Sequence, residues 1–568
     1  MRNLKRALSL ALASVMLLGM MVVGSSAKGI DDFTDKAEIV NQDAVAVTSA
    51  IGMFEGYEDG SFGPENVVTR AEMAVIICTM LYGAGVNVNQ FAETNVFTDV
   101  PAWAQGYVNL CSSLGIVAGV GDGKFDPNAT VTTAQAVLML CRALGYFQSA
   151  ADFGSDWMLA ATAKGTALGL YGDLKLTANA GLTRDNVAEL VFNALTKAVP
   201  VQYNELLGVY YNENKGILYS LTYYYTDTLG YKNFDLVYKT NENTDYGRPG
   251  TTWGIGSYRM DGSPSGEGNK EGVLNEDGSL IPERVKMTSD DEIITVADTP
   301  DFTYTANTKE NVIYKAVGKS VVDDYAWNIY VDGAEQAGDD LAPANDKDTD
   351  YTYTAKGATT EIYVDDVNET VTVVMINYYM AEVTKVKDGE NTVRVLSNAT
   401  KTSPIDERTI AANGFAVDEY VVITVDVDDD GDSFVASIDA PATAEGSVSY
   451  VSKLSEAEGN KDGQYAKLDD GNKYTYSKYT ASDLDDINME HPTLDVNYRL
   501  YLDPNGYVLG FVQETGSTQY LYVKDSDEEL RDWVAKVVLA DATSVKADLD
   551  DEYKDGKDKV KIDWVDND

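Results

Sequence analysis

The 568-residue sequence has few of the residues on which common catalytic sites depend. It contains a single histidine, His491, which precedes a proline in a turn-like stretch and is expected to be an exposed loop residue. This scarcity argues against a Ser-His-Asp site, a Cys-His site and a histidine-rich metal centre. No local pattern nominates a pair of carboxylates for glycoside hydrolysis. We therefore expect a chain that is not an enzyme, with a glycoside hydrolase as the alternative.

Basic residues are also scarce: 44 Lys and Arg stand against 91 Asp and Glu, a net charge of −47. Such a charge repels nucleic acid and anionic lipid and attracts cations, so Ca²⁺ is the one cofactor that we expect. Asp426, Asp428 and Asp430 fit the start of a calcium loop, but Ser437 stands where an EF-hand needs Glu. Two interpretations of this segment therefore remain, a calcium site and an acidic hairpin turn.

Long apolar runs are missing except for residues 7–23, which follow a basic N-terminus. Ser25 and Ala27 come next, with the spacing that signal peptidase accepts. We predict that residues 1–27 are a secretion signal that is removed, after which the chain has no membrane segment. An uncleaved membrane anchor is the alternative.

Only three cysteines occur, and an odd number in an exported chain gives no self-contained disulfide framework. Cys78 and Cys141 lie 63 residues apart, which is also the period of an internal repeat. Together with Cys111 they are expected to be small buried helix residues rather than ligands.

The repeat is most evident in residues 56–72 and 119–135, where GYEDGSFGP with VVTRAE is followed 63 residues later by GVGDGKFDP with TVTTAQ. A shorter third copy spans residues 168–185. Asp59-Gly60 and Asp122-Gly123 mark tight turns in the first two copies. Each copy is predicted to form a helix, a glycine-rich loop and a second helix, and three copies can bury a shared core.

Helical spacing supports this prediction in the second copy. Trp103, Tyr107, Leu110 and Leu114 form one apolar face before the loop. A second face follows the loop and comprises Val137, Leu138, Cys141 and Leu144.

Phe97-Thr98-Asp99, Trp103-Ala104, residues 114–119 and residues 122–127 resemble the S-layer homology family, and the resemblance extends over residues 31–199. It implies a three-pronged, pseudo-threefold helical domain that binds secondary cell-wall polysaccharide, typically through a pyruvylated amino sugar. The segment 245–253 is similar to one found in surface-layer proteins of gut clostridia.

The motif that begins each second helix has two interpretations. Threonine followed three residues later by Glu or Gln is typical of a capping box. Arginine in the first turn of a helix opposes the helix dipole. This favours a carboxylate-binding role for Arg70 and Arg184 over a surface ion pair. It also predicts that removing these arginines costs little stability. The residues expected at these helix starts are Thr69, Glu72, Thr132, Gln135 and Thr183.

The copies also differ. The second has Thr133 where the other two have arginine, and the first has Val40 at the position of Trp103 and Trp157. These tryptophans either stack on a sugar ring or belong to the core, and both remain open. Binding by the middle groove is therefore in doubt.

Beyond residue 200 the pattern changes to short β-strands, so the fold class is a multidomain α + β chain: an all-α three-repeat domain followed by tandem, sandwich-like β modules. Hairpins are predicted at 362–376, 421–438 and 498–512, and residues 263–276 look like a linker. The predicted divisions are 28–88, 95–148 and 150–199 for the repeats, then 205–300, 301–380, 381–442 and 443–520. The charged segment 521–568 is predicted to be a last module, for which an incomplete module is one interpretation.

These features favour a non-catalytic surface-layer or surface-layer-like protein, secreted to the cell wall and able to self-associate into a lattice. The alternative is a wall-anchored enzyme, carbohydrate binder or adhesion protein on the same anchor.

Overall fold

The structure is a computed structural model in which the chain divides into two compact units. Unit 1 comprises Met1–Asp301, Asp323–Asn328 and Ile362–Val373, and unit 2 comprises Phe302–Val322, Ile329–Glu361 and Val374–Asp568. The residues that the structure describes are 29–92, 96–212, 216–217, 223–260, 273–338, 341–396, 408–412, 414–428, 430–452, 464–481, 492–514 and the strands between 522 and 561. The predicted secretion signal, His491 and most of the predicted linker lie outside them.

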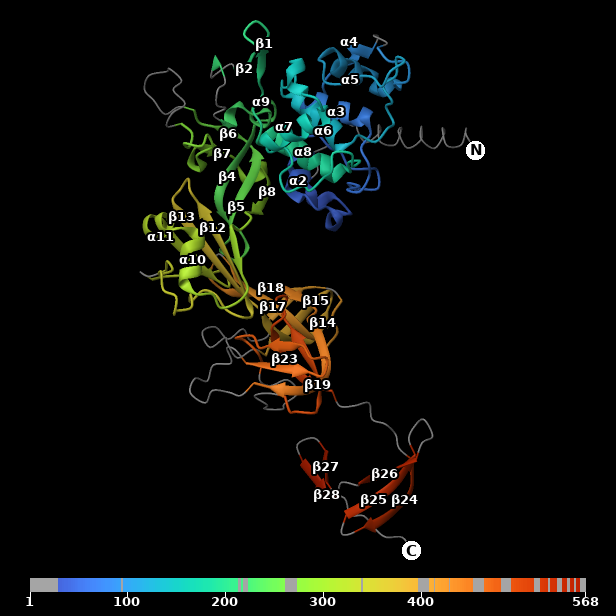
Figure 1. Cartoon of the computed structure of the whole chain (residues 1–568), viewed down its shortest axis with the longest axis vertical. Coiled ribbons are helices and arrows are strands. Elements are labelled where there is room, and N and C mark those ends of the chain that lie inside the picture. Colours follow the sequence, from blue (N-terminus) through green and yellow to red (C-terminus); the bar gives the residue numbers. More distant parts are fainter. Residues whose placement is uncertain are drawn as a thin grey trace. The chain divides into compact units, whose positions relative to one another are not determined.

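Helices form the N-terminal part of unit 1, as the periodicity predicts (Figure 1). The first helix of each repeat is α2 (Gln42–Ala50), α5 (Ala102–Ser113) or α7 (Trp157–Ala167), and the second is α3 (Arg70–Tyr82), α6 (Thr133–Ala143) or α8 (Arg184–Thr196). The short α4 (Asn89–Ala92) lies between the first two repeats. Leu114 does not join the predicted apolar face, because α5 ends before it and its side chain is 41% exposed.

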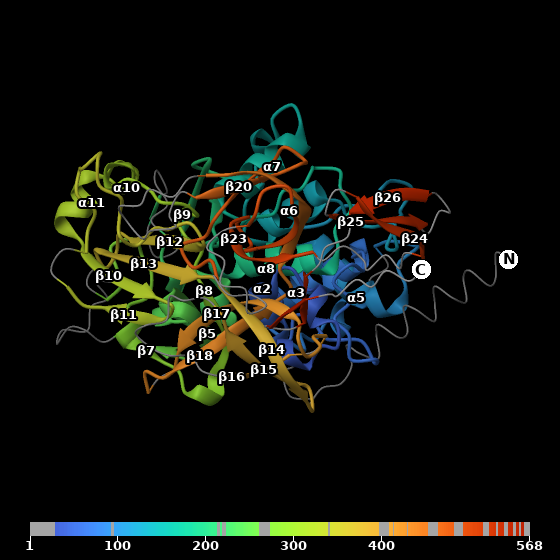
Figure 2. The ribbon, with the colours of Figure 1, turned by 90° about the horizontal axis from the view of Figure 1, so that it is seen from below.

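The repeats share one core because they pack in a cycle. Helix α3 packs against α5, α6 against α7 and α8 against α2, so each second helix meets a first helix of another repeat. The segments leading into α3, α6 and α8 close a ring of hydrogen bonds: Val68 N donates to Leu182 O (3.0 Å), Leu182 N to Val131 O (3.1 Å) and Val131 N to Val68 O (2.9 Å). Figure 2 shows these helices from below.

Small sheets follow in unit 1. Strands β1 (Gln202–Asn204), β2 (Val209–Asn212) and β3 (Gly216–Ile217) form one sheet; β4 (Leu236–Asn243), β5 (Pro249–Ile255) and β8 (Glu292–Ala297) form a second; β6 (Ser257–Tyr258) pairs with β7 (Val285–Lys286). Trp253 of β5 packs edge-on against Phe192 of α8, with ring centroids 5.0 Å apart, so this sheet extends the helical core.

Three five-stranded sheets come next. Their orders are β11-β10-β13-β12-β9, β16-β15-β14-β17-β18 and β21-β20-β19-β22-β23. The strands are β9 (Phe302–Tyr304), β10 (Ala326–Val331), β11 (Ala334–Gln336), β12 (Ala358–Asp365), β13 (Thr370–Asn377), β14 (Tyr379–Lys387), β15 (Glu390–Val395), β16 (Arg408–Ala411), β17 (Tyr420–Val427), β18 (Ser433–Asp439), β19 (Ala442–Val451), β20 (Tyr465–Leu468), β21 (Lys473–Thr475), β22 (Asn497–Leu502) and β23 (Val508–Gln513). Two small sheets complete the chain: β24 (Tyr522–Glu529), β25 (Asp532–Val538) and β26 (Ser544–Asp548), then β27 (Glu552–Asp555) and β28 (Asp558–Lys561).

The three predicted hairpins are confirmed as β12–β13, β17–β18 and β22–β23. The chain is therefore a mixed α and β multidomain protein. Three short helices in the β-rich part were not predicted: α9 (Leu229–Phe234), α10 (Glu310–Val317) and α11 (Lys319–Asp324). The end of α10 has a sequence signal, because Gly318 follows it with φ +102°, a conformation that glycine adopts easily at a helix end. No helix in the described part of the chain is long and apolar enough to cross a membrane.

Candidate functional site

The second helix of each repeat begins at a threonine cap. Thr69 Oγ1 accepts a hydrogen bond from Glu72 N (3.3 Å), and Glu72 Oε2 accepts one from Thr69 N (2.7 Å). Thr132 and Gln135 make the same reciprocal pair. Thr183 caps α8 by accepting a hydrogen bond from Asn186 N, without the reciprocal bond of the other two caps. These side chains satisfy backbone donors that the helix leaves free, which fixes where each helix starts.

Arg70, the first residue of α3, points into the loop of the second repeat. Its Nε donates to Phe125 O (3.1 Å) and its Nη2 to Ala118 O (2.9 Å). The guanidinium carbon lies 4.5 Å from the centre of the Phe125 ring, and the residue is only 8% exposed. Burial lowers the arginine pKa, and the charges of Asp126 and Asp99 oppose that shift. Arg70 therefore clamps the neighbouring loop.

Arg184 makes the same contacts with the first repeat. Its Nε donates to Phe62 O (2.9 Å) and its Nη2 to Glu55 O (2.8 Å). Its guanidinium carbon lies 4.9 Å from the centre of the Phe62 ring and 5.0 Å from that of Tyr57. Burial lowers its pKa as well.

These contacts change the expectation for both arginines. In the described part of the chain neither guanidinium forms an ion pair with a carboxylate within 4.0 Å, so the surface ion pair is not observed. Four hydrogen bonds to carbonyl groups favour a stabilising role for the arginines, so we now predict that their removal costs stability. A ligand role through the remaining guanidinium donors stays a prediction.

The third loop, which Thr133 of the middle repeat contacts, differs from the two loops that meet an arginine. In the loops that meet arginine, the ring under the guanidinium belongs to Phe125 or Phe62. Ala134 N donates to Ala178 O of the third loop, just as Ala71 N donates to Pro127 O of the second.

This match places Leu176, two residues before Ala178, where the second loop has Phe125. Thr133 is fully buried and donates its hydroxyl to Ala180 O (3.2 Å). An arginine there would meet Leu176 where the other two loops offer the ring of Phe125 or Phe62.

The loops themselves are shaped by aspartates and glycines. Asp59 Oδ1 accepts hydrogen bonds from the hydroxyl and the amide of Ser61. These bonds lower the pKa of Asp59, and the bond from the hydroxyl has the larger effect. Gly60 has φ +86° and Gly123 φ +67°, in the left-handed region, and Asp122 enters it too at φ +49°. These residues build the turns of the loops.

One functional aspartate was missed by sequence reasoning. Asp35 accepts hydrogen bonds from Phe62 N (2.7 Å) and Gly63 N (2.8 Å), and so positions the first loop. Asp99 does the same in the second repeat, with Phe125 N (2.8 Å) and Asp126 N (2.9 Å). The sequence carries the signal, because Phe33-Thr34-Asp35 repeats Phe97-Thr98-Asp99.

The two tryptophans lie in different environments. Trp103 is half-buried and packs against the shared core of the repeats. Trp157, the first residue of α7, is 39% exposed, and Val40, at the corresponding place of the first repeat, is 78% exposed. Trp157 is thus the better placed of the two to stack on a ligand.

The predicted calcium ligands do not share one environment. Asp426 is buried in β17, whereas Asp428 and Asp430 are in the exposed turn before β18. Asp428 Oδ1 accepts hydrogen bonds from Asp430 N (3.1 Å) and Asp432 N (2.8 Å), as in a simple hairpin turn. In the described residues no group of three or more His, Cys, Asp or Glu is arranged to hold a metal ion.

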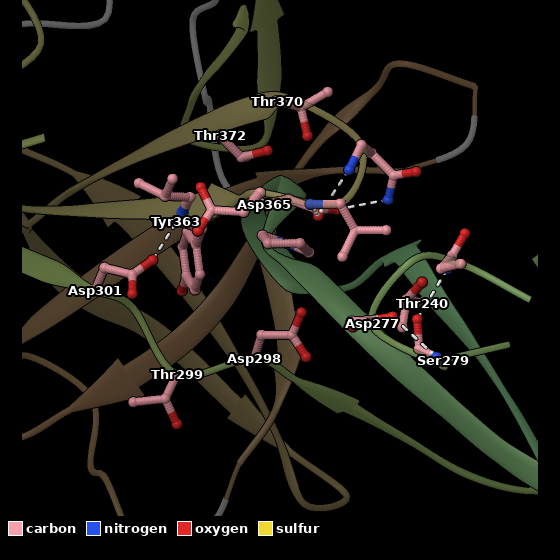
Figure 3. A pocket seen from close by; sticks show the side chains of 16 residues that line it. Thr240, Asp277, Ser279, Asp298, Thr299, Asp301, Tyr363, Asp365, Thr370 and Thr372 are labelled. Carbon is pink, nitrogen blue, oxygen red and sulfur yellow. Dashed lines mark hydrogen bonds between the residues drawn. The ribbon is translucent and has the colours of Figure 1, made fainter. Parts of the chain in front are cut away.

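Unit 1 also contains an acidic pocket of about 460 Å³ (Figure 3). Asp298, Asp301 and Asp365 project into it together with threonine hydroxyls. Each of these carboxylates accepts a local hydrogen bond: Asp298 from Thr251 Oγ1 (3.1 Å), Asp301 from Val364 N (2.7 Å) and Asp365 from Val367 N (2.9 Å). These hydrogen bonds hold the three carboxylates in place within the pocket.

Comparison with known proteins identifies the first two repeats. The model of the S-layer homology domain matches residues 32–74 and 96–137. The chain is 35% identical over 198 residues to a cell surface protein of Thermoanaerobacter kivui, covering 34% of this chain and 25% of that protein. It is 31% identical over 210 residues to a surface layer protein of Brevibacillus choshinensis (36% of this chain, 17% of that protein).

A third relative is a cellulosome-anchoring protein of Acetivibrio thermocellus, 29% identical over 102 residues (18% of this chain, 23% of that protein). The chain thus spans a quarter or less of the length of these relatives.

Proposed function

We propose that this chain, a secreted protein of the cell wall or cell surface that carries S-layer homology domains, is held non-covalently to a secondary cell-wall polysaccharide by its N-terminal helices. It acts there without catalysis, as a surface-layer or surface-layer-like structural protein. The match of the S-layer homology model to residues 32–74 and 96–137 carries this proposal. The relative named as a cellulosome-anchoring protein supports an anchoring role.

The anchor is proposed to be a three-repeat, pseudo-threefold domain. Two observations support this: the cyclic packing of the helix pairs and the ring of hydrogen bonds between Val68, Val131 and Leu182. Grooves between the repeats would then receive the polymer, with Trp157 as a stacking platform for a sugar ring. A pyruvylated sugar would bring a carboxylate toward the remaining donors of Arg70 and Arg184.

The β-rich remainder is proposed to form tandem, sandwich-like modules outside the anchor that contact other copies of the chain in a lattice. The single histidine of the sequence supports a non-catalytic role for it. Calcium is proposed to assist by binding to a chain of net charge −47.

Sedimentation with cell walls tests the proposal. The purified full chain is mixed with wall sacculi, with sacculi from which the secondary polysaccharide has been extracted by acid, and with native sacculi plus the soluble polysaccharide. We expect co-sedimentation with native sacculi only, because the extracted wall lacks the ligand and the soluble polymer competes for it. Equal binding to native and extracted sacculi would show that the wall ligand is not this polysaccharide.

A further inference from the structure

The three cysteine thiols are buried, as the repeat spacing predicts, but two of them touch. Cys78 of α3 and Cys111 of α5 are fully buried, and their Sγ atoms lie 3.5 Å apart. The contact is reciprocal, because Cys78 Sγ lies 3.6 Å from Tyr107 O and Cys111 Sγ 3.6 Å from Ala74 O, each one helical turn before the other cysteine. The two sulfurs thus meet where two repeats cross.

We infer that Cys78 and Cys111 are an oxidisable pair, which closes to a disulfide that joins the first repeat to the second. Closure needs the sulfurs to approach from 3.5 Å to about 2 Å. Both carbonyls that the thiols contact lie inside helices, where they also accept backbone hydrogen bonds, so losing the thiol hydrogens leaves no buried acceptor unpaired. A secreted protein meets the oxidising conditions in which disulfides persist.

The step is a thiol–disulfide exchange with a small-molecule disulfide as oxidant. One cysteine thiolate attacks a sulfur of the oxidant, which releases a thiol and leaves a mixed disulfide. The second cysteine thiolate displaces the remaining half and forms the Cys78–Cys111 bond. The protein loses two protons and two electrons in all, and the oxidant takes them up as its disulfide becomes two thiols.

The environment of the two cysteines determines when the Cys78–Cys111 bond can form. The pKa of the Cys111 thiol is raised well above its usual value, mainly by the hydrogen bond with Cys78 and secondly by burial. Because the thiolate is the attacking species, exchange is slow while α3 and α5 are packed. The bond therefore forms as the repeats fold or when the two helices separate.

Cys141 provides a matched control inside the same domain. It occupies the place of Cys78 one repeat later, and burial raises its pKa to about 12. At its helix crossing, Gly165 of α7 packs so closely that an added Cβ would lie 2.5 Å from Val137 Cγ1. No second thiol is therefore placed to pair with Cys141.

Refolding in a redox buffer tests the inference. The reduced, denatured full chain is refolded over a range of ratios of oxidised to reduced glutathione, free thiols are blocked with a maleimide under denaturing conditions, and intact mass and disulfide-linked peptides are measured. We expect a single two-electron transition to a chain with one blocked thiol, Cys141, and one Cys78–Cys111 peptide. Cys141→Ser should leave this transition unchanged, and Cys111→Ser, checked for folding by circular dichroism, should abolish it.

A second measurement follows the thermal midpoint. The bond closes a loop of 33 residues, so the oxidised chain should unfold several degrees higher than the reduced chain. Three free thiols at the most oxidising ratio, a bridge that includes Cys141, or linkage between chains would each overturn the inference. So would an oxidised chain that melts no higher than the reduced one.

Discussion

Arg70 and Arg184 illustrate how a residue can be placed correctly by sequence while its partners in the fold stay unknown. A cation in the first turn of a helix opposes the dipole, which suggested a ligand or a surface partner. In the structure each guanidinium contacts two carbonyl groups and an aromatic ring of another repeat, and the ligand role stays a prediction. Helical spacing reports only contacts along one helix, so the sequence could not reveal a partner 122 residues away.

The first prediction concerns the stability that these arginines provide. Arg184→Ala removes two charge-assisted hydrogen bonds and the stacking on Phe62, and should lower the free energy of unfolding by about 2 to 4 kcal/mol. Arg70→Ala should behave alike. Urea unfolding followed by circular dichroism measures both. Lys175→Ala, at an exposed basic residue of the third loop, is the control and should change stability by less than about 0.5 kcal/mol. Arginine variants as stable as the control would contradict the clamp.

A second prediction separates ligand binding from folding. Trp157 is 39% exposed, so Trp157→Ala should cost little stability, whereas the loss of a stacking platform should weaken binding to wall sacculi several-fold. Leu159→Ala is the matched control, because Leu159 lies on the same helix and is 69% exposed. Sedimentation isotherms with native sacculi measure both variants. Equal binding by Trp157→Ala and the parent chain would remove Trp157 from the site.

Secondary-structure elements were predicted best where a short pattern determines them. The β22–β23 hairpin follows from Pro504-Asn505-Gly506 between two apolar runs, and the capping threonines mark the starts of α3, α6 and α8. The helices α10 and α11 were missed because each is shorter than three turns and lies among strands, where periodicity is weak evidence. The order of strands in each sheet depends on pairing between distant segments, which local patterns do not encode.

The β22–β23 hairpin also supplies a prediction about pH. Asp503 is 2% exposed, and burial raises its pKa to about 6, against hydrogen bonds from Tyr507 N and Asn505 N that lower it. The folded chain therefore holds the proton of the Asp503 carboxyl more tightly than the unfolded chain does. The protonated carboxyl adds its full contribution to the free energy of unfolding below about pH 4, and this contribution is lost as pH rises through about 6. The loss amounts to at most about 3 kcal/mol.

The test compares unfolding free energies at pH 4.5 and 7.5 for three chains. Asp503→Asn keeps the acceptor oxygen but cannot ionise, so its stability should fall less between these two pH values than that of the parent chain. Asp470, in the turn between β20 and β21, is the control, because hydrogen bonds, chiefly from Asn472 N, lower its pKa. Asp470→Asn should show the same decrease in unfolding free energy between pH 4.5 and 7.5 as the parent chain. Parallel pH profiles for Asp503→Asn and the parent chain would contradict the assignment.

At the scale of the whole molecule, charge is the property that the sequence states most directly. An excess of 47 negative charges opposes compaction through mutual repulsion, and salt screens that repulsion over roughly 10 Å at 0.1 M ionic strength. The described residues hold no cluster of three or more metal-ligating side chains, so cations are expected to act on many carboxylates rather than at one built site. Composition predicts that cations affect stability, but it does not predict where they would bind.

The last prediction follows from this distribution of charge. Millimolar Ca²⁺ should raise the thermal midpoint of the full chain, since any cation that binds the folded state more tightly than the unfolded state stabilises it by mass action. NaCl at matched ionic strength should give a smaller rise, because monovalent ions only screen the repulsion. Asp428→Asn, which alters the exposed turn before β18, should leave the calcium effect in place if binding is spread over the chain. Differential scanning calorimetry with chelator, NaCl and CaCl₂ distinguishes these cases. A midpoint that moves equally with NaCl and CaCl₂ would reduce the effect to screening, and loss of the calcium effect in Asp428→Asn would instead locate it at that single turn.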